Sequence, residues 1–181
     1  YSVIRPGIKF LFSLIALTLM ILAVARPQFG SRLEEVKKQG VEVIIALDVS
    51  NSMLAQDIQP DRLTRAKQAL NRLIDNLEND KIGLIVFAGD AYTQIPITTD
   101  YISAKMFLST INPALVPKQG TAIGSAIELG MRSFTPGDDK SRAMIIITDG
   151  ENHEDDPVAT ATEASKAGII IHTIGIGSAG G

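Results

Sequence analysis

Short apolar runs that alternate with helical patterns constrain the fold of this chain most strongly. Residues 41–47 (VEVIIAL), 82–87, 143–147 and 169–174 are rich in β-branched residues. Continuous apolar runs of this length are typical of strands that are buried on both faces of a parallel sheet. Their alternation with helices predicts right-handed βαβ units. The expected fold is therefore α/β, a doubly wound and mostly parallel sheet with helices on both faces.

The remaining elements are predicted from weaker patterns. Residues 91–99 (AYTQIPITT) alternate imperfectly and include Pro96, which indicates a short edge strand. Pro60 is expected to open a helix with one apolar stripe, made of Leu63, Ala66, Leu70, Leu73, Ile74 and Leu77. Further helices are predicted at about 101–111, 122–134 and 158–167. In such a sheet, ligands bind at the carboxyl ends of the strands where the strand order reverses.

The N-terminal region contains an uncharged apolar segment, residues 10–25 (FLFSLIALTLMILAVA). As a helix it would span roughly 24 Å at about 1.5 Å per residue. Ile8 and a snorkelling Lys9 would extend it towards about 28 Å, close to the ~30 Å of a bilayer core. The sequence therefore predicts a flank at 1–7, a transmembrane helix at 8–25, a juxtamembrane linker at 26–40 and a domain at 41–181.

A cleaved signal peptide is the main alternative for this segment. Arg5 and Lys9 precede the apolar stretch, and residues 23–25 (AVA) form an A-x-A pattern. Arg26 and Pro27 directly after that pattern disfavour cleavage, so a retained anchor is the preferred interpretation. The basic residues on the two sides are too evenly distributed to fix the orientation of the helix.

Charge excludes one large class of function. From Arg26 onward the chain has 15 basic and 20 acidic residues, a formal net charge of −5. This balance is the opposite of that of a basic nucleic-acid binder, and a modestly acidic domain suits a cation site. The chain has no cysteine, so disulfides and thiolate metal sites are excluded.

Oxygen-bearing side chains gather in three loops that a doubly wound sheet would bring together. The first loop, residues 48–52 (DVSNS), follows the first strand of the domain. The second is Gly120-Thr121 before a predicted helix, and the third is Thr148-Asp149-Gly150 after a later strand. The candidate metal ligands are Asp48, Ser50, Ser52, Thr121 and Asp149.

The chemistry of these residues favours magnesium, with manganese and calcium as alternatives. Mg²⁺ takes about six oxygen ligands and keeps several waters, so a few protein ligands suffice. Ser50 and Ser52 are two residues apart, so a tight turn can direct both hydroxyls at one ion. Two carboxylates only balance a divalent ion, which would remain electrophilic towards one further anion. We therefore expect a partner to offer a carboxylate.

The same residues match the metal-ion-dependent adhesion site of von Willebrand factor A domains. Further runs at 25–28 (ARPQ), 54–63 (LAQDIQPDRL), 87–89 (FAG), 94–96 (QIP) and 148–156 (TDGENHEDD) resemble the bacterial Bat membrane proteins, named for aerotolerance in Bacteroides. Members of that family usually have another membrane helix upstream and a strand, helix and membrane segment downstream. The resemblance therefore implies that this sequence is part of a longer protein and that the C-terminal part of the A domain lies outside it.

The resemblance also carries expectations about location and partners. It implies a protein of the bacterial inner membrane, with residues 1–7 on the cytoplasmic side and the A domain in the periplasm. It implies partnership with other Bat proteins, including tetratricopeptide-repeat members, and a functional link to MoxR-type AAA+ ATPases. A role in tolerance of oxidative stress follows from the same resemblance.

Several other acidic and histidine residues lie in the predicted strands and in the loops that follow them. Glu151 is a candidate for shaping the metal's surroundings, because it closely follows Asp149. Asp57 and Asp90 follow the first two strands and are candidates for the rim of the site, although turn stabilisation is the preferred explanation for both. His153 lies in a polar loop that is expected to be solvated, and His172 in an apolar strand is expected to be a core histidine.

A glycine-rich run near the end of the sequence does not indicate a nucleotide site. Residues 175–180 (GIGSAG) match G-x-G-x-x-G, but a dinucleotide site needs that loop after the first strand and before a helix.

The leading functional hypothesis is metal-mediated binding of a protein partner, without enzymatic activity. The main rival is Mg²⁺-dependent phosphoryl transfer headed by Asp48, because a strand-final aspartate can attack phosphate. Against it, Ser50 stands where a second acid is expected, and no lysine follows as a phosphate clamp. A structural membrane scaffold with an incidental metal is the third possibility.

Overall fold

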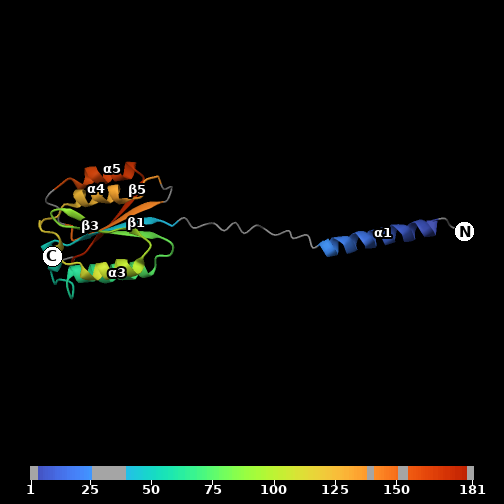
Figure 1. The fold of residues 1–181 in the computed structure, drawn as a ribbon, viewed down its shortest axis with the longest axis horizontal. Helices are drawn as coiled ribbons and strands as arrows, with labels where there is room; N and C mark the ends of the chain where they lie inside the picture. The colour runs from blue at the N-terminus through green and yellow to red at the C-terminus, as the bar shows by residue number, and fades with distance from the viewer. Residues whose placement is uncertain (1–3, 26–39, 138–140, 151–154, 179–181) are drawn as a thin grey trace. The chain divides into compact units, whose positions relative to one another are not determined.

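The computed structural model describes residues 4–25, 40–137, 141–150 and 155–178 (Figure 1). The chain divides into two compact units, residues 1–37 and 38–181. The first unit contains helix α1 (Ile4–Ala25), which starts earlier than the predicted residue 8. Its segment Gly7–Ala25 has a mean hydropathy of 2.5 and no buried residue. By length and composition this helix is able to cross a membrane, although a signal sequence would pass the same test.

The second unit is built on a five-stranded sheet. Its strands are β1 (Glu42–Asp48), β2 (Lys81–Phe87), β3 (Ala91–Thr98), β4 (Arg142–Thr148) and β5 (Ile169–Gly175). They lie in the order β3-β2-β1-β4-β5, and only the β2–β3 pairing is antiparallel. The predicted doubly wound, mostly parallel sheet is therefore confirmed. The strand order reverses at β1, which has β2 on one side and β4 on the other.

Helices cover both faces of this sheet (Figure 1). Alternate residues of β1 enter two separate cores, because successive side chains of a strand point to opposite faces. Val43, Ile45 and Leu47 pack with α2 (Arg62–Asp75) and α3 (Tyr101–Thr110). Ile44 and Ala46 pack with α4 (Ile123–Ser133) and α5 (Pro157–Lys166). Strand β1 is thus the centre of the domain.

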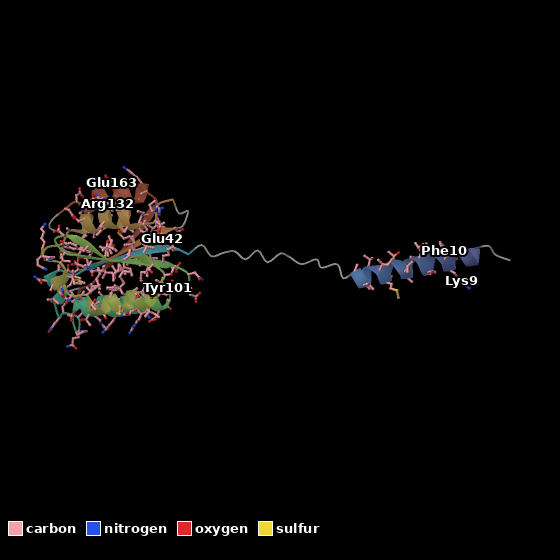
Figure 2. All side chains as sticks on the ribbon, in the orientation of Figure 1. Lys9, Phe10, Glu42, Tyr101, Arg132 and Glu163 are labelled. Carbon is pink, nitrogen blue, oxygen red and sulfur yellow. The ribbon has the colours of Figure 1, made fainter. Side chains whose placement is uncertain are left out.

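A charged side chain is buried at the start of the central strand. Glu42 at the start of β1 is fully buried (Figure 2), and its carboxylate accepts bonds from Lys81 Nζ at 2.9 Å and Thr135 N at 3.0 Å. Burial alone would raise the pKa of Glu42, but these bonds outweigh burial and lower it. Glu42 therefore ties β1 to β2 and to the chain after α4 at the edge of the sheet opposite the strands' carboxyl ends.

The predicted start of one helix was wrong. Helix α2 begins at Arg62, not at Pro60, because Asp61 accepts a bond from Thr64 N at 2.7 Å and so caps the helix. The predicted stripe nevertheless faces the core, with Leu63, Ala66, Leu70 and Ile74 buried. Strand β3 is an edge strand as predicted, and its eight residues, Ala91–Thr98, pair along β2 across two irregularities in register.

The expectation of a core histidine in β5 was also wrong. His172 is exposed, as are most residues of β5 after Ile169. The reason is position in the sheet: β5 pairs with β4 on one side, and no strand among the described residues pairs with its other side. An apolar run predicts a strand, but it does not show whether that strand is central or at an edge.

Candidate metal centre

The candidate site is organised around a buried carboxylate at the end of β1. Asp48 is completely buried. Its Oδ1 accepts a bond from the backbone N–H of Ser50 at 2.8 Å, and its Oδ2 accepts one from the hydroxyl of Thr148 at 2.7 Å. Strands β1 and β4 are parallel neighbours, so their carboxyl ends place Asp48 beside the Thr148-Asp149 turn.

A tight turn after β1 places two hydroxyls side by side. Ser50 precedes the short helix η1 (Asn51–Leu54), and its carbonyl accepts the N–H of Met53 at 3.1 Å. The Ser50 and Ser52 Oγ atoms lie 2.9 Å apart. The structure therefore has the arrangement that the two-residue spacing predicted, with both hydroxyls on one side of the turn.

The loop that contains Thr121 reaches the same edge by way of β2. Two backbone hydrogen bonds connect it to the end of β2. The N–H of Ala122 donates to Ala88 O at 2.7 Å, and the N–H of Gly89 donates to Lys118 O at 3.0 Å. Thr121 is only 3% exposed. The preceding Gly120 has a φ of 131°, a backbone conformation that L side chains rarely adopt.

A shallow groove marks where this loop approaches the turn after β1. Its volume is about 390 Å³, and it is lined by Asn51, Pro113, Ala114, Val116, Pro117 and Gln119. Asn51 belongs to the turn that contains the two serines, and Gln119 belongs to the loop before Thr121. The two hydroxyl-bearing loops are therefore neighbours across this groove.

Asp149 lies in a network of ion pairs. Its side chain is only 1% exposed, and its Oδ2 accepts a bond from Arg62 Nη1 at 3.1 Å. The guanidinium of Arg62 also donates from Nε and Nη2 to the two oxygens of Asp57, at 2.8 and 2.9 Å. Asp57 in turn accepts the N–H of Ser178 at 2.8 Å. Arg62 thus connects the end of β4 with the loop before α2, and Asp57 connects that loop with the chain after β5.

The electrostatics of the aspartates differ. Burial raises the pKa of Asp48, and the charge of Asp149 adds to this, although hydrogen bonds from Ser50 and Thr148 oppose it. The guanidinium of Arg62 holds the pKa of Asp57 far below its usual range. A nearby cation would therefore stabilise the charged form of the buried Asp48 carboxylate.

This donor set fits a hard divalent cation. It combines the carboxylates of Asp48 and Asp149 with the hydroxyls of Ser50, Ser52 and Thr121. No group of three or more His, Cys, Asp or Glu side chains able to hold a metal is found in the part of the chain that the structure describes. A site rich in thiolates or imidazoles is therefore not built by these residues, whereas a hydroxyl-rich oxygen site suits Mg²⁺, Mn²⁺ or Ca²⁺.

The predicted rim residues have different positions. Asp57 contacts Arg62, which contacts Asp149, so Asp57 is linked to the candidate ligands through Arg62. Asp90 is exposed in the turn between β2 and β3, where its carbonyl accepts the N–H of Ala88 at 3.0 Å. Glu151 and His153 lie outside the described residues.

Two residues at this edge were missed by sequence reasoning. Thr148 was considered only as part of a turn, yet it bonds to Asp48, and Arg62 was not singled out, yet it pairs with Asp149. The strand-final position of Thr148 was an available signal. No local pattern links Arg62 to a residue 87 positions away.

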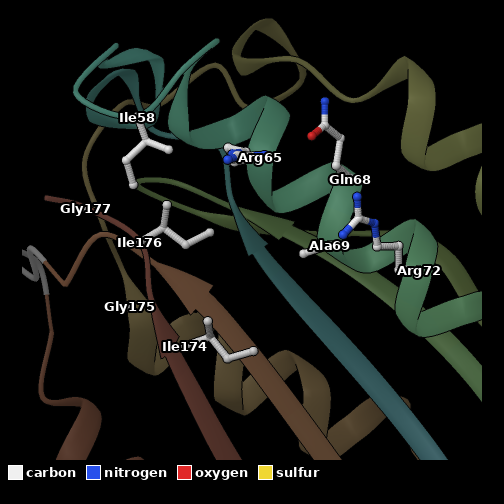
Figure 3. A pocket seen from close by; sticks show the side chains of 9 residues that line it. All are labelled: Ile58, Arg65, Gln68, Ala69, Arg72, Ile174, Gly175, Ile176 and Gly177. Atoms are coloured by element: carbon white, nitrogen blue, oxygen red, sulfur yellow. The ribbon is translucent and has the colours of Figure 1, made fainter.

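Two larger or similar grooves formed by described residues have none of the candidate ligands in their linings. One of about 360 Å³ lies between α2 and the end of β5 (Figure 3), lined by Ile58, Arg65, Gln68, Ala69, Arg72 and residues 174–177. Another of about 580 Å³ lies beside α5 and is mostly apolar. Volume therefore does not identify the candidate centre, which is identified by its buried polar groups.

Comparison with known proteins gives a consistent result. The model of the von Willebrand factor type A domain matches residues 42–180. The crystal structure of BatB from Bacteroides thetaiotaomicron is 64% identical, with a TM-score of 0.75 over 76% of this chain and 67% of that one. An aerotolerance-related membrane protein from Bacteroides fragilis is 62% identical, with a TM-score of 0.74 over 76% of this chain and 68% of that one.

More distant matches concern the fold and the length of the relatives. Proximal thread matrix protein 1 from the mussel byssus, in a structure with a zinc-occupied MIDAS motif, is 20% identical with a TM-score of 0.67. That match covers 77% of this chain and 36% of the mussel chain, and it shows a shared fold. The chain spans about half the length of the curated relatives it matches. The chain belongs to the von Willebrand factor type A domain family and is similar to the Bat membrane proteins of Bacteroides.

Proposed function

We propose that this chain is a membrane-anchored A domain that binds a protein partner through a divalent metal. The observation that supports the proposal most directly is the buried Asp48 carboxylate, which bonds to the turn that carries the paired hydroxyls of Ser50 and Ser52. The Asp149 side chain, 1% exposed, follows the neighbouring strand β4. Two carboxylates would balance the charge of one divalent ion without saturating its coordination. The bound ion would then attract one further oxygen anion, which a partner's Asp or Glu side chain supplies.

The roles of the residues follow from their chemistry. Ser50, Ser52 and Thr121 would offer hydroxyl oxygens, and Asp48 and Asp149 would supply negative charge directly or through bound water. When bound, the metal would act as a Lewis acid for a carboxylate ligand. Thr148 would hold the Asp48 carboxylate in place through the 2.7 Å bond to Oδ2. We propose Mg²⁺ as the resident ion, with Mn²⁺ or Ca²⁺ as alternatives.

The membrane role rests on α1 and on the relatives. The segment Gly7–Ala25 is long and apolar enough to span a bilayer, and similar proteins are described as membrane proteins. We propose that α1 anchors the chain in the bacterial inner membrane with the A domain in the periplasm. The proposed partners are other Bat proteins, including tetratricopeptide-repeat members, with a functional link to MoxR-type AAA+ ATPases and to oxidative stress tolerance.

The experiment is cross-linking in native membranes, followed by mass spectrometry. Wild type is compared with Ser52→Ala and with the control Ser109→Ala, whose exposed hydroxyl bonds only within α3. We expect the same partner cross-links for wild type and the control, and their loss for Ser52→Ala or after EDTA. Addition of Mg²⁺ should restore them in wild type.

Two other outcomes would replace the proposal. Cross-links that survive both Ser52→Ala and EDTA would favour a scaffold with an incidental metal. Turnover of a generic phosphoester by the full chain, dependent on Mg²⁺ and lost in Asp48→Asn, would favour phosphoryl transfer.

A further inference from the structure

The guanidinium of Arg62 directly contacts Asp149, a candidate metal ligand. Its Nη1 lies 3.1 Å from Asp149 Oδ2, and both side chains are largely shielded from water, at 16% and 1% exposed. The guanidinium of an arginine is not deprotonated in proteins. A fixed positive charge therefore lies against one carboxylate of the candidate site at any physiological pH.

The orientation of the guanidinium is set by Asp57. Two of the guanidinium's donors, Nε and Nη2, point to the two oxygens of Asp57 at 2.8 and 2.9 Å. This side-on, two-bond geometry fixes the plane of the group and leaves Nη1 for Asp149. The Asp57–Arg62 pair is thus a dipole whose positive end faces the candidate site.

We propose that Arg62 weakens the binding of a divalent cation at this site and makes the bound cation more attractive to an anionic ligand. This inference rests on the proposed metal site. Arg62 occupies one oxygen of Asp149, and its charge repels an incoming cation while reducing the negative charge that the protein offers to it. A bound cation therefore retains more positive charge for a partner's carboxylate. Arg62 is a positioning and charge-tuning residue, not a ligand.

This role differs from a purely structural one in the sign of the effect. A residue that merely holds the loop before α2 in place would, on removal, loosen the site and weaken metal binding. A residue that opposes the cation would, on removal, strengthen binding. For Asp57 the expected effect has the opposite sign. Removal of the Asp57 charge leaves Asp149 as the only carboxylate of the pair that Arg62 interacts with, so metal binding should weaken.

The test uses the full chain in detergent micelles with Mn²⁺ as the probe. Its affinity is measured by electron paramagnetic resonance for wild type, Arg62→Gln, Arg62→Lys and Asp57→Asn. Arg65→Gln is the matched control, because it removes the same charge from the same helix at an exposed position. Thermal unfolding in EDTA reports the stability of each variant separately.

We expect Arg62→Gln to bind Mn²⁺ about tenfold more tightly than wild type, within the range known for groups that contact metal ligands. Arg62→Lys, which keeps the charge, and Arg65→Gln should resemble wild type. Asp57→Asn should bind several-fold more weakly. Acetate should coordinate the bound Mn²⁺ less tightly in Arg62→Gln than in wild type.

The outcomes that overturn the inference are distinct from failure of the proposed function. If wild type binds Mn²⁺ and Arg62→Gln binds it equally or more weakly, the inference is wrong while the metal site stands. If Arg62→Gln does not fold, tighter or unchanged binding by Asp57→Asn is enough to reject the inference. Absence of Mn²⁺ binding by wild type would reject both.

Discussion

The hydroxyl of Thr148 donates a hydrogen bond to Asp48 Oδ2 at 2.7 Å, which joins the ends of β4 and β1. Both residues are buried, and they are 100 positions apart in the chain. Asp48 Oδ1 is held separately by the N–H of Ser50, so the carboxylate is fixed at both oxygens. The orientation of the central aspartate is therefore determined by two strands and a turn, not by its own loop alone.

Replacement of Thr148 by valine tests this relationship. Valine keeps the shape of the side chain but removes the donor to Asp48, so we expect Mn²⁺ affinity to fall by roughly 10–100-fold. Thr148→Ser, which keeps the hydroxyl, should bind much as wild type does. Thr173→Val on the exposed part of β5 is the control. Equal affinities for wild type and Thr148→Val would show that the bond does not matter to the metal.

Gly89 offers a test that removes no polar group. A Cβ at this position would lie 2.6 Å from the carbonyl oxygen of Gln119 and 3.0 Å from that of Lys118. Gly89→Ala should therefore push the loop that contains Thr121 away from β2. We expect a loss of about 1–3 kcal/mol in the free energy of unfolding, measured by urea denaturation, together with weaker Mn²⁺ binding.

The control for this variant is Gly175→Ala at the end of β5. A Cβ there has no atom within 4 Å, and the φ of Gly175 is not in the left-handed region. This variant should keep both the stability and the Mn²⁺ affinity of wild type. If Gly89→Ala also kept both, the close approach of the two loops would be of no consequence.

Asp57 gives the domain an acid-dependent contribution to stability. Its pKa in the folded chain is lowered from 3.8 by the bonds from Arg62, so the folded state favours the ionised carboxylate. This contribution is fully present well above pH 3.8 and is lost as the pH falls below that value through the folded pKa. Thermal unfolding in EDTA, followed from pH 6 to about pH 2.5, should show a smaller acid-induced decrease for Asp57→Asn than for wild type. Parallel curves for the two proteins would contradict the assignment.

The N-cap of α2 makes a separate prediction about stability. Asp61 accepts bonds from Thr64 N and Thr64 Oγ1 at 2.7 and 2.8 Å. Asp61→Ala should lower the free energy of unfolding by about 1 kcal/mol, measured by urea denaturation, because the first turn loses its side-chain acceptor. Asp61→Asn should retain most of the stability. If Asp61→Ala has the same free energy of unfolding as wild type, water replaces the side-chain cap without cost.

Much of the fold was predictable from the sequence because its strands are continuous apolar runs. Each run was located to within one or two residues, since a buried parallel strand needs apolar side chains on both faces. The beginning of α2 was misplaced because the cap depends on the rotamer of Asp61, which the sequence pattern does not specify. The exposure of His172 was missed because it depends on where β5 lies in the sheet.

The candidate site was predictable in part for a similar reason. Asp48, Ser50 and Ser52 lie in one short loop, so their spacing alone indicated paired hydroxyls beside a carboxylate. Asp149 could be added because parallel strands end at a common edge, and Thr121 because the helices of a doubly wound sheet begin at that same edge. The strand-final position of Thr148 was a signal that could have been used, whereas the contact of Arg62 with Asp149 depends on tertiary packing between distant segments and has no local pattern.

The most direct test of the metal site is a crystal structure of the chain grown with Mn²⁺ and recorded at a wavelength that reveals manganese by anomalous scattering. We expect one strong peak among Ser50, Ser52, Thr121 and Asp149, and its disappearance in crystals of Ser52→Ala. Manganese bound only elsewhere on the protein, or a peak that persists unchanged in Ser52→Ala, would contradict a metal held by these hydroxyls.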